Sequence, residues 1–257
     1  GMFLLRESML DSLIRVRDRY LKPDGIILPS HAKMYWGIVS AEGEWERMRG
    51  ELNDALGAWR PFTATLKETY GVDYAVLTSD YVDEQNEYYI RHSRWSQLDG
   101  EDMISDGALV KSIDVKTVTL AEARGVEKTA FSLNILRDAN ATGFAGWFTT
   151  LFDANSGGPQ KDDGDPDDTS KIGEHGEDRV VLSTAPDAGP THWGQQYFPF
   201  RKPLYLKKGD VVEGTMEMFR SNKTYRTYKV MSSWHIKRVS DDKTQNIMNT
   251  TVLWHLE

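Results

Sequence analysis

The chain has 257 residues, of which 39% are hydrophobic and 27% are charged, and its formal net charge is −8. It contains no cysteine, which excludes disulfides, thiolate nucleophiles and cysteine-ligated zinc sites. No run of about 18 apolar residues occurs, so no membrane-spanning helix is expected. The start of the chain does not resemble a secretory signal, and a cytoplasmic or nuclear location is expected.

The negative charge is concentrated in one segment, residues 153–178, which has nine acidic residues against two lysines. The rest of the chain is nearly neutral, so direct binding to nucleic acid is not expected. Residues 155–178 are rich in glycine, aspartate and proline, and their only aliphatic residue is Ile172. This composition predicts a disordered surface loop.

The chain opens with a predicted helix over residues 8–21, where Leu10, Leu13, Ile14 and Leu21 follow helical spacing. The sequence Lys-Pro-Asp-Gly at residues 22–25 ends it. Short extended segments are expected at residues 26–29 and 34–39.

A second helix is predicted within residues 42–70, because one apolar stripe recurs there with spacings of three and four. Charged residues occupy its opposite face. We expect Arg60-Pro61 to end this helix. The stripe consists of Trp45, Met48, Leu52, Ala55, Leu56 and Trp59.

The remainder of the chain favours strands, because β-branched and aromatic residues alternate with polar ones between turn signals. Many short strands with few helices predict a closed or sandwiched β architecture. The expected strands lie around Ile113 and Val115, around Phe131 to Ile135, and within residues 143–152, 211–219, 227–236 and 249–256.

No glycine-rich dinucleotide loop, phosphate-binding loop, nucleophile elbow or zinc-protease motif occurs in the sequence. The six histidines are scattered without metal-ligand spacing, so no metal site is predicted. These residues alone describe a β-rich domain with a helical excursion and an acidic loop, without naming a function.

Three segments together resemble the protein arginine methyltransferases. That family has a loop with two glutamates that ends in Glu-Ser-Met-Leu, and this chain has that sequence at residues 7–10. The family's Thr-His-Trp loop is matched at residues 191–193, after the strand-like residues 180–186. Weaker matches are residues 25–29, 70–74, 207–210 and 214–216.

The resemblance implies a mainly β fold: a distorted β-barrel or two-sheet sandwich with an N-terminal helix and an inserted helical dimerisation arm. Residues 1–21 would join it to a cofactor domain that the sequence lacks. Residues 22–257 would form the substrate-binding barrel, with the arm at 42–70 and the acidic loop at 153–178. The implied reaction transfers a methyl group from S-adenosylmethionine to arginine in protein substrates, with asymmetric dimethylation as the expected type. This chain alone is expected to be inactive and to bind no cofactor.

Glu7 matches one of the two carboxylates that hold the substrate guanidinium, and the other would precede Gly1. A guanidinium is planar and always charged, and its donors form a fork that carboxylates bind. The alternative is a helix-start glutamate that interacts with the helix dipole.

The other implied site residues belong to the same pocket. His192 would pair with a carboxylate of the cofactor domain and Trp193 would line the arginine channel; the alternatives are a turn histidine and a packing residue. Met9 matches a methionine that crowds the attacking nitrogen, or else it faces the helix core. Met2 stands where many members have tyrosine, which leaves the shape of the pocket open.

The stripe residues Trp45, Met48, Leu52, Leu56 and Trp59 are the predicted dimer interface, for a homodimer or a paired paralogue. We expect them to stay exposed or to pair with another copy; the alternative is a helix folded back on its own core. Two other readings of the chain remain open. One is part of a catalytically dead paralogue that scaffolds an active enzyme, and the other is an unrelated β-sandwich binding module, for example one that binds carbohydrate.

Overall fold

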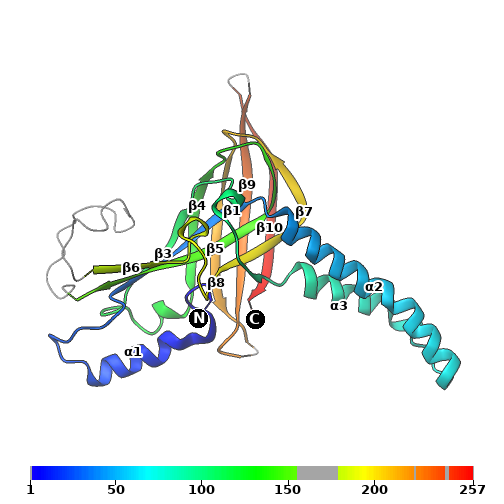
Figure 1. The fold of residues 1–257 in the computed structure, drawn as a ribbon, viewed down its shortest axis with the longest axis horizontal. Coiled ribbons are helices and arrows are strands. Elements are labelled where there is room, and N and C mark those ends of the chain that lie inside the picture. Colours follow the sequence, from blue (N-terminus) through cyan, green and yellow to red (C-terminus); the bar gives the residue numbers. More distant parts are fainter. Residues whose placement is uncertain (1, 155–178, 223, 241–242, 257) are drawn as a thin grey trace.

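The computed structural model describes residues 2–154, 179–222, 224–240 and 243–256. Two antiparallel sheets form its centre, and helices project from it on two sides (Figure 1). Nearly all of the predicted acidic loop lies outside the described residues. Its flanking strands pair with each other, with Asp153 opposite Arg179.

The first sheet has the order β2-β7-β5-β1-β3, and β6 pairs with β5 off this path. Its strands are β1 (His31–Val39), β2 (Arg94–Ser96), β3 (Ala108–Asp114), β5 (Ala139–Asp153), β6 (Arg179–Ser183) and β7 (Gln195–Leu206). The second sheet has the order β10-β9-β8-β4, and its strands are β4 (Val126–Asn134), β8 (Val211–Arg220), β9 (Tyr228–Ser240) and β10 (Lys243–Leu256).

The expected β architecture is confirmed as two sheets that do not close into a barrel through continuous pairing of the described strands. Two isolated bridges connect the sheets, Ser105 with Ile135 and His92 with His255. Most strands lie where alternation predicted them. Residues 26–29 are a correction, because they form no strand and only residues 31–39 of that region are extended.

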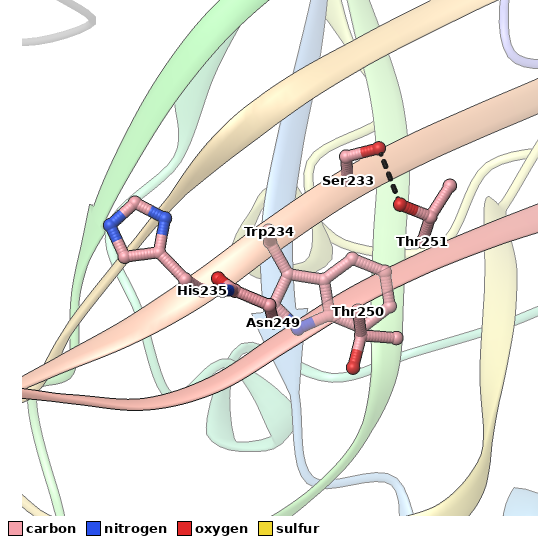
Figure 2. Close-up of a pocket in the computed structure, with 6 residues that line it drawn as sticks. All are labelled: Ser233, Trp234, His235, Asn249, Thr250 and Thr251. Carbon is pink, nitrogen blue, oxygen red and sulfur yellow. Dashed lines mark hydrogen bonds between the residues drawn. The ribbon is translucent and has the colours of Figure 1, made fainter.

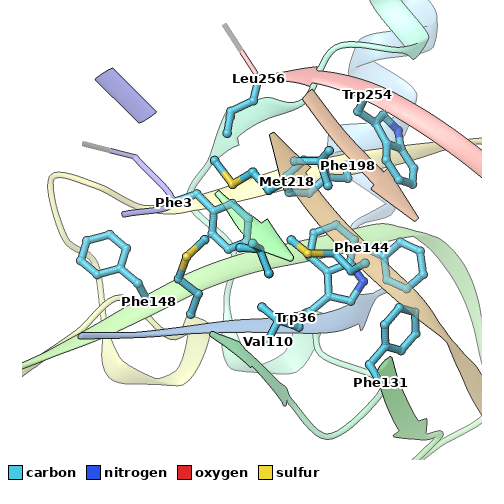
Figure 3. Packing of buried hydrophobic residues seen from close by; sticks show 14 of the residues in the cluster. Phe3, Trp36, Val110, Phe131, Phe144, Phe148, Phe198, Met218, Trp254 and Leu256 are labelled. Carbon is cyan, nitrogen blue, oxygen red and sulfur yellow. The ribbon is translucent and has the colours of Figure 1, made fainter. Parts of the chain in front are cut away.

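The core between the sheets is aromatic (Figure 3). The ring of Trp36 lies 4.8 Å from that of Phe144 and 4.7 Å from that of Phe198, and it is fully buried. The N-terminal segment (residues 2–8) enters this core, because Phe3 is 2% exposed and packs against Trp36 and Phe198. Gly146 makes room for it, since a Cβ there would lie 2.6 Å from the Phe3 ring.

Helix α1 (Met9–Tyr20) confirms most of the first predicted helix, but its beginning differs. Residues 6–8 form a short 3-10 turn, η1 (Arg6–Ser8), in which Glu7 has φ 75° and Ser8 has φ 57°. Both lie in the left-handed region, which ordinary residues adopt only at a cost. Glu7 is therefore not a first-turn residue of a regular α-helix.

The helix of the arm is longer than predicted. Helix α2 (Glu42–Tyr70) continues through Pro61, so the expectation that Arg60-Pro61 ends it is wrong. It ends instead at Gly71, whose φ of 69° and N–H bond to the carbonyl of Lys67 form a glycine cap. After η2 (Tyr74–Leu77), helix α3 (Thr78–Ile90) returns alongside α2 (Figure 1). The sequence reading did not predict α3. The remaining short turns are η3 (Gly100–Asp102), η4 (Glu122–Arg124) and η6 (Pro186–Ala188).

Candidate functional site

Glu7 is held by the turn between β8 and β9, which is distant in sequence. Its backbone N–H donates to the carbonyl of Arg226 over 2.9 Å, and its carboxylate Oε1 accepts from Nη2 of Arg226 over 2.8 Å. The Glu7 side chain is 40% exposed. A carboxylate predicted to bind a guanidinium therefore already contacts one and remains open to solvent.

Ser8 also bonds the N-terminal segment to the turn between β8 and β9. Its hydroxyl donates to the carbonyl of Tyr225 and lies 3.0 Å from the hydroxyl of Tyr228. Tyr228 also accepts from Nε of Arg220 over 3.2 Å. The kink before α1 is therefore built on β8 and β9.

Asp11 attaches the first turn of α1 to the same hairpin. It forms ion pairs with Arg124 and with Arg220, and its side chain is 16% exposed. Burial alone would raise the pKa of Asp11, but the hydrogen bonds from Arg220 and Arg124 outweigh it, so the pKa lies below its ordinary value. The carboxylate stays ionised and holds α1 against β8.

The Thr-His-Trp loop lies just before β7. His192 is exposed, and its ring is 5.8 Å from that of Trp193. Trp193 is partly buried and packs edge-on against Phe148 at 6.2 Å. Gly194 closes the loop with φ 50°, and a Cβ there would lie 2.7 Å from the carbonyl of Ser96. The loop therefore needs glycine at this position.

The N-terminal segment and the Thr-His-Trp loop both pack on the same hydrophobic core, but their polar side chains form no hydrogen bond or ion pair with each other in the described residues. Phe3 and Trp193 both contact the main hydrophobic cluster. Within the described residues, no hydrogen bond or ion pair links Glu7 to His192. Met2 is half-buried, and its sulfur accepts from Nη1 of Arg6. Met9 is 65% exposed, so the alternative that it faces the helix core is wrong.

The predicted interface stripe packs on its own chain. Met48 and Leu52 are 0% and 1% exposed, and Nε1 of Trp45 donates to the carbonyl of Phe200 over 2.9 Å. Trp59 stacks on Tyr81 of α3 at 4.1 Å. Leu56 is half-buried. The expectation that the stripe stays exposed or pairs with another copy is wrong for the buried Met48 and Leu52.

Apart from Tyr88 of α3, the exposed apolar residues of the arm lie farther out, towards its tip. They are Phe62, Tyr70, Val72, Tyr74, Val76 and Leu77. Sequence reasoning missed them because Phe62 and Tyr70 lie on α2 beyond its expected end at Pro61, and residues 72–77 belong to a connecting turn without a periodic helix face. Helical periodicity marks the face that packs against a neighbour, and here the neighbour is α3 and the sheet.

Comparisons with known proteins agree with this arrangement. The family model described as "Arginine methyltransferase oligomerization subdomain" matches residues 48–240. The chain belongs to the protein arginine methyltransferase family. The solved structure of Arabidopsis thaliana protein arginine methyltransferase 10 superposes with a TM-score of 0.83 at 30% identity, covering 100% of this chain and 68% of that one.

Two curated members of the family are similar over most of this chain. The Arabidopsis thaliana protein arginine N-methyltransferase PRMT10 is 32% identical over 97% of this chain and 61% of its own length. The Oryza sativa subsp. japonica PRMT10 is 36% identical over 88% of this chain and 55% of its own length. This chain thus spans less than two thirds of either methyltransferase.

The described residues of this family member contain no cluster of three His, Asp or Glu side chains that could hold a metal ion. Among the helices that the structure describes, none is long and apolar enough to cross a membrane. A shallow pocket of about 330 Å³ lies on β9 and β10 (Figure 2). The hydroxyls of Ser233 and Thr251, which line this pocket, form a hydrogen bond of 2.8 Å. None of the predicted site residues lines the pocket.

Proposed function

We propose that this chain supplies the arginine-binding and dimerisation portion of a methyltransferase that transfers a methyl group from S-adenosylmethionine to arginine in protein substrates. One observation carries the proposal beyond family membership. The Glu7 carboxylate lies 2.8 Å from a guanidinium nitrogen, is partly open to solvent, and sits on a strained turn next to α1. Strained backbone conformations cluster at functional sites.

The chemistry follows from charge and shape. A carboxylate that accepts from two guanidinium nitrogens fixes the orientation of the third and draws positive charge away from it. S-adenosylmethionine would supply the methyl group when bound to the full-length protein. The role of Glu7 is to hold the substrate guanidinium and to stabilise the charge that develops as the nitrogen is methylated.

The remaining site residues act around this carboxylate. Met9 is exposed at the start of α1, two residues from Glu7, and would limit space beside the attacking nitrogen in the way that favours asymmetric dimethylation. Trp193 would line the arginine channel, Met2 would contribute to its wall, and the exposed His192 would pair with a carboxylate of the cofactor domain. The 257-residue chain alone would be inactive, because its sequence has no glycine-rich cofactor loop.

The arm would make the dimer, through its tip rather than through its helical stripe. The exposed apolar residues around Val72 to Leu77 form the kind of patch that marks interfaces. The partner would be a second copy or a paralogue. The competing function is a dead scaffold that activates another subunit, and the retained Glu7 together with the intact Thr-His-Trp loop favours the active enzyme.

The test is methyl transfer by the full-length protein. It is incubated with S-adenosylmethionine carrying a labelled methyl group and with an arginine-containing peptide, and the hydrolysed product is separated by chromatography. We expect label in asymmetric dimethylarginine, and none when every arginine of the peptide is replaced by lysine. Label only in symmetric dimethylarginine would refute the product type. No transfer by the protein alone, with transfer restored in an added paralogue, would favour the scaffold.

A further inference from the structure

The turn between β8 and β9 holds Glu7 and Ser8 at four points. Two contacts join Glu7 to Arg226, one through the backbone N–H and one through the carboxylate. Two more join the Ser8 hydroxyl to the carbonyl of Tyr225 and to the hydroxyl of Tyr228. All four join residues near the start of the chain to residues near its end, so they set the position of Glu7 in space.

Such contacts are needed because Glu7 and Ser8 both adopt left-handed backbone angles, with φ of 75° and 57°. A non-glycine residue in that region persists only when its surroundings compensate for the strain. Without the turn, the segment before α1 would relax towards ordinary angles, and the Glu7 carboxylate would move away from its present place.

We propose that Arg226 is a positioning residue for the substrate-binding carboxylate of Glu7. The inference rests on the proposed function, in which Glu7 binds the substrate guanidinium. Arg226 acts through Glu7 alone: its carbonyl fixes the Glu7 backbone, and its guanidinium fixes the direction of the Glu7 side chain. The substrate arginine binds to the same carboxylate at its other oxygen.

The geometry favours this role over a guanidinium that merely blocks the site. The ion pair uses only Oε1 of Glu7, and among the described residues nothing donates to Oε2. A carboxylate offers about four acceptor positions, so a second guanidinium can bind beside the first. A blocking arginine would instead occupy both oxygens in the fork geometry that arginine and carboxylates adopt when unconstrained.

Further contacts tie the described residues of the turn to their surroundings. Arg220, on the adjoining end of β8, donates to the Tyr228 hydroxyl that contacts Ser8, and it also pairs with Asp11 of α1. The turn itself is closed by a 2.9 Å bond from the N–H of Ser221 to the carbonyl of Thr227. The residues around Arg226 are therefore bonded both to the N-terminal segment and to the strands β8 and β9.

The experiment compares Arg226→Ala, Arg226→Lys and Lys237→Ala in the full-length protein, with kcat and KM measured separately for an arginine peptide. Lys237 is the matched control, because it forms an ion pair of 2.6 Å with Glu213 on the same two strands and lies partly exposed. A misplaced catalytic group can cost on the order of 100-fold in rate. We expect Arg226→Ala to lower kcat at least tenfold with KM changed less than threefold, Arg226→Lys to recover most of kcat, and Lys237→Ala to match the wild type.

Three results would overturn the assignment: an unchanged kcat in Arg226→Ala, a raised kcat/KM that shows a blocking role, or an equal loss in Lys237→Ala that shows general weakening of the hairpin. If Arg226→Ala does not fold, Arg226→Gln keeps an unbranched polar side chain but removes the charge and shortens the reach towards Glu7, and it must then show the same loss of kcat. A wild type without methyl transfer would contradict the proposed function. An active wild type with an unaffected Arg226→Ala would contradict only the positioning role.

Discussion

The arm has a buried and an exposed apolar surface, and we expect serine substitutions to affect stability at the first and dimerisation at the second. Leu52 is 1% exposed at the base of α2, whereas Val76 is 78% exposed at the tip. We expect Leu52→Ser to destabilise the fold and leave the tip intact. The paired change Val76→Ser with Leu77→Ser should leave the fold intact and remove the dimer.

The magnitudes follow from burial. Truncating a buried leucine costs about 2–5 kcal/mol, and a hydroxyl left unpaired in its place adds about 1–3 kcal/mol. At roughly 2–4 °C for each kcal/mol in a chain of this size, the melting temperature should fall by about 6 °C or more. Substitutions at exposed tip positions usually stay within about 0.5 kcal/mol.

The assay is differential scanning calorimetry with sedimentation equilibrium on the full-length protein. Because dimerisation itself raises the melting temperature by mass action, both variants are compared at several concentrations. A Leu52→Ser protein that melts normally but sediments as a monomer would show that the helical stripe is the interface. A tip variant that remains a dimer would show that the exposed apolar residues do not bind the partner.

Two further predictions concern the fold and the Thr-His-Trp loop. Asp210 is 2% exposed and accepts from Nε and Nη2 of Arg238. Burial would raise the pKa of Asp210, but these bonds and the backbone bond from Lys207 hold it below its ordinary value. Breaking such a buried pair costs about 3–5 kcal/mol. Because the folded-state pKa is lowered, this stability is present above the ordinary aspartate pKa and is lost as the pH falls. Urea unfolding should therefore show a large deficit for Asp210→Asn at pH 7 that shrinks below about pH 4; a deficit constant with pH would mean that charge is not its cause. His192→Ala should lower methyl transfer by less than the loss of Glu7 does, since its proposed role is orienting other groups, and steady-state rates equal to the wild type would make it a simple turn residue.

Local pattern was enough to predict most of the strands, because their alternation reflects which face each residue turns to the core, but β2 and β7 were not predicted. It was not enough for the arm. Pro61 is a strong breaker in sequence, yet α2 continues through it with the proline exposed. Apolar spacing located the buried face of α2 correctly. Whether that face packs against a second copy or against α3 could not be predicted, because α3 itself has only a weak periodic pattern of apolar residues.

The candidate site also has a part that the sequence predicts and a part that it does not. Glu7, His192 and Trp193 could be found from short motifs. The contact between Glu7 and Arg226 spans 219 residues, and it accompanies left-handed angles at Glu7 and Ser8. Neither spacing nor propensity encodes such a pair, so the sequence predicted the carboxylate without the turn that holds it.

Glu7 is the residue on which the proposed function depends most, as the carboxylate that binds the substrate guanidinium. Its most direct test is the single-turnover rate of methyl transfer to an arginine peptide by full-length Glu7→Gln and by the wild type. The amide keeps the shape of the side chain and the acceptor oxygen for Arg226 but removes the charge. We expect an unchanged melting temperature and a rate lowered about 100-fold or more, as for other groups that stabilise charge in a transition state. A rate within threefold of the wild type would contradict the account.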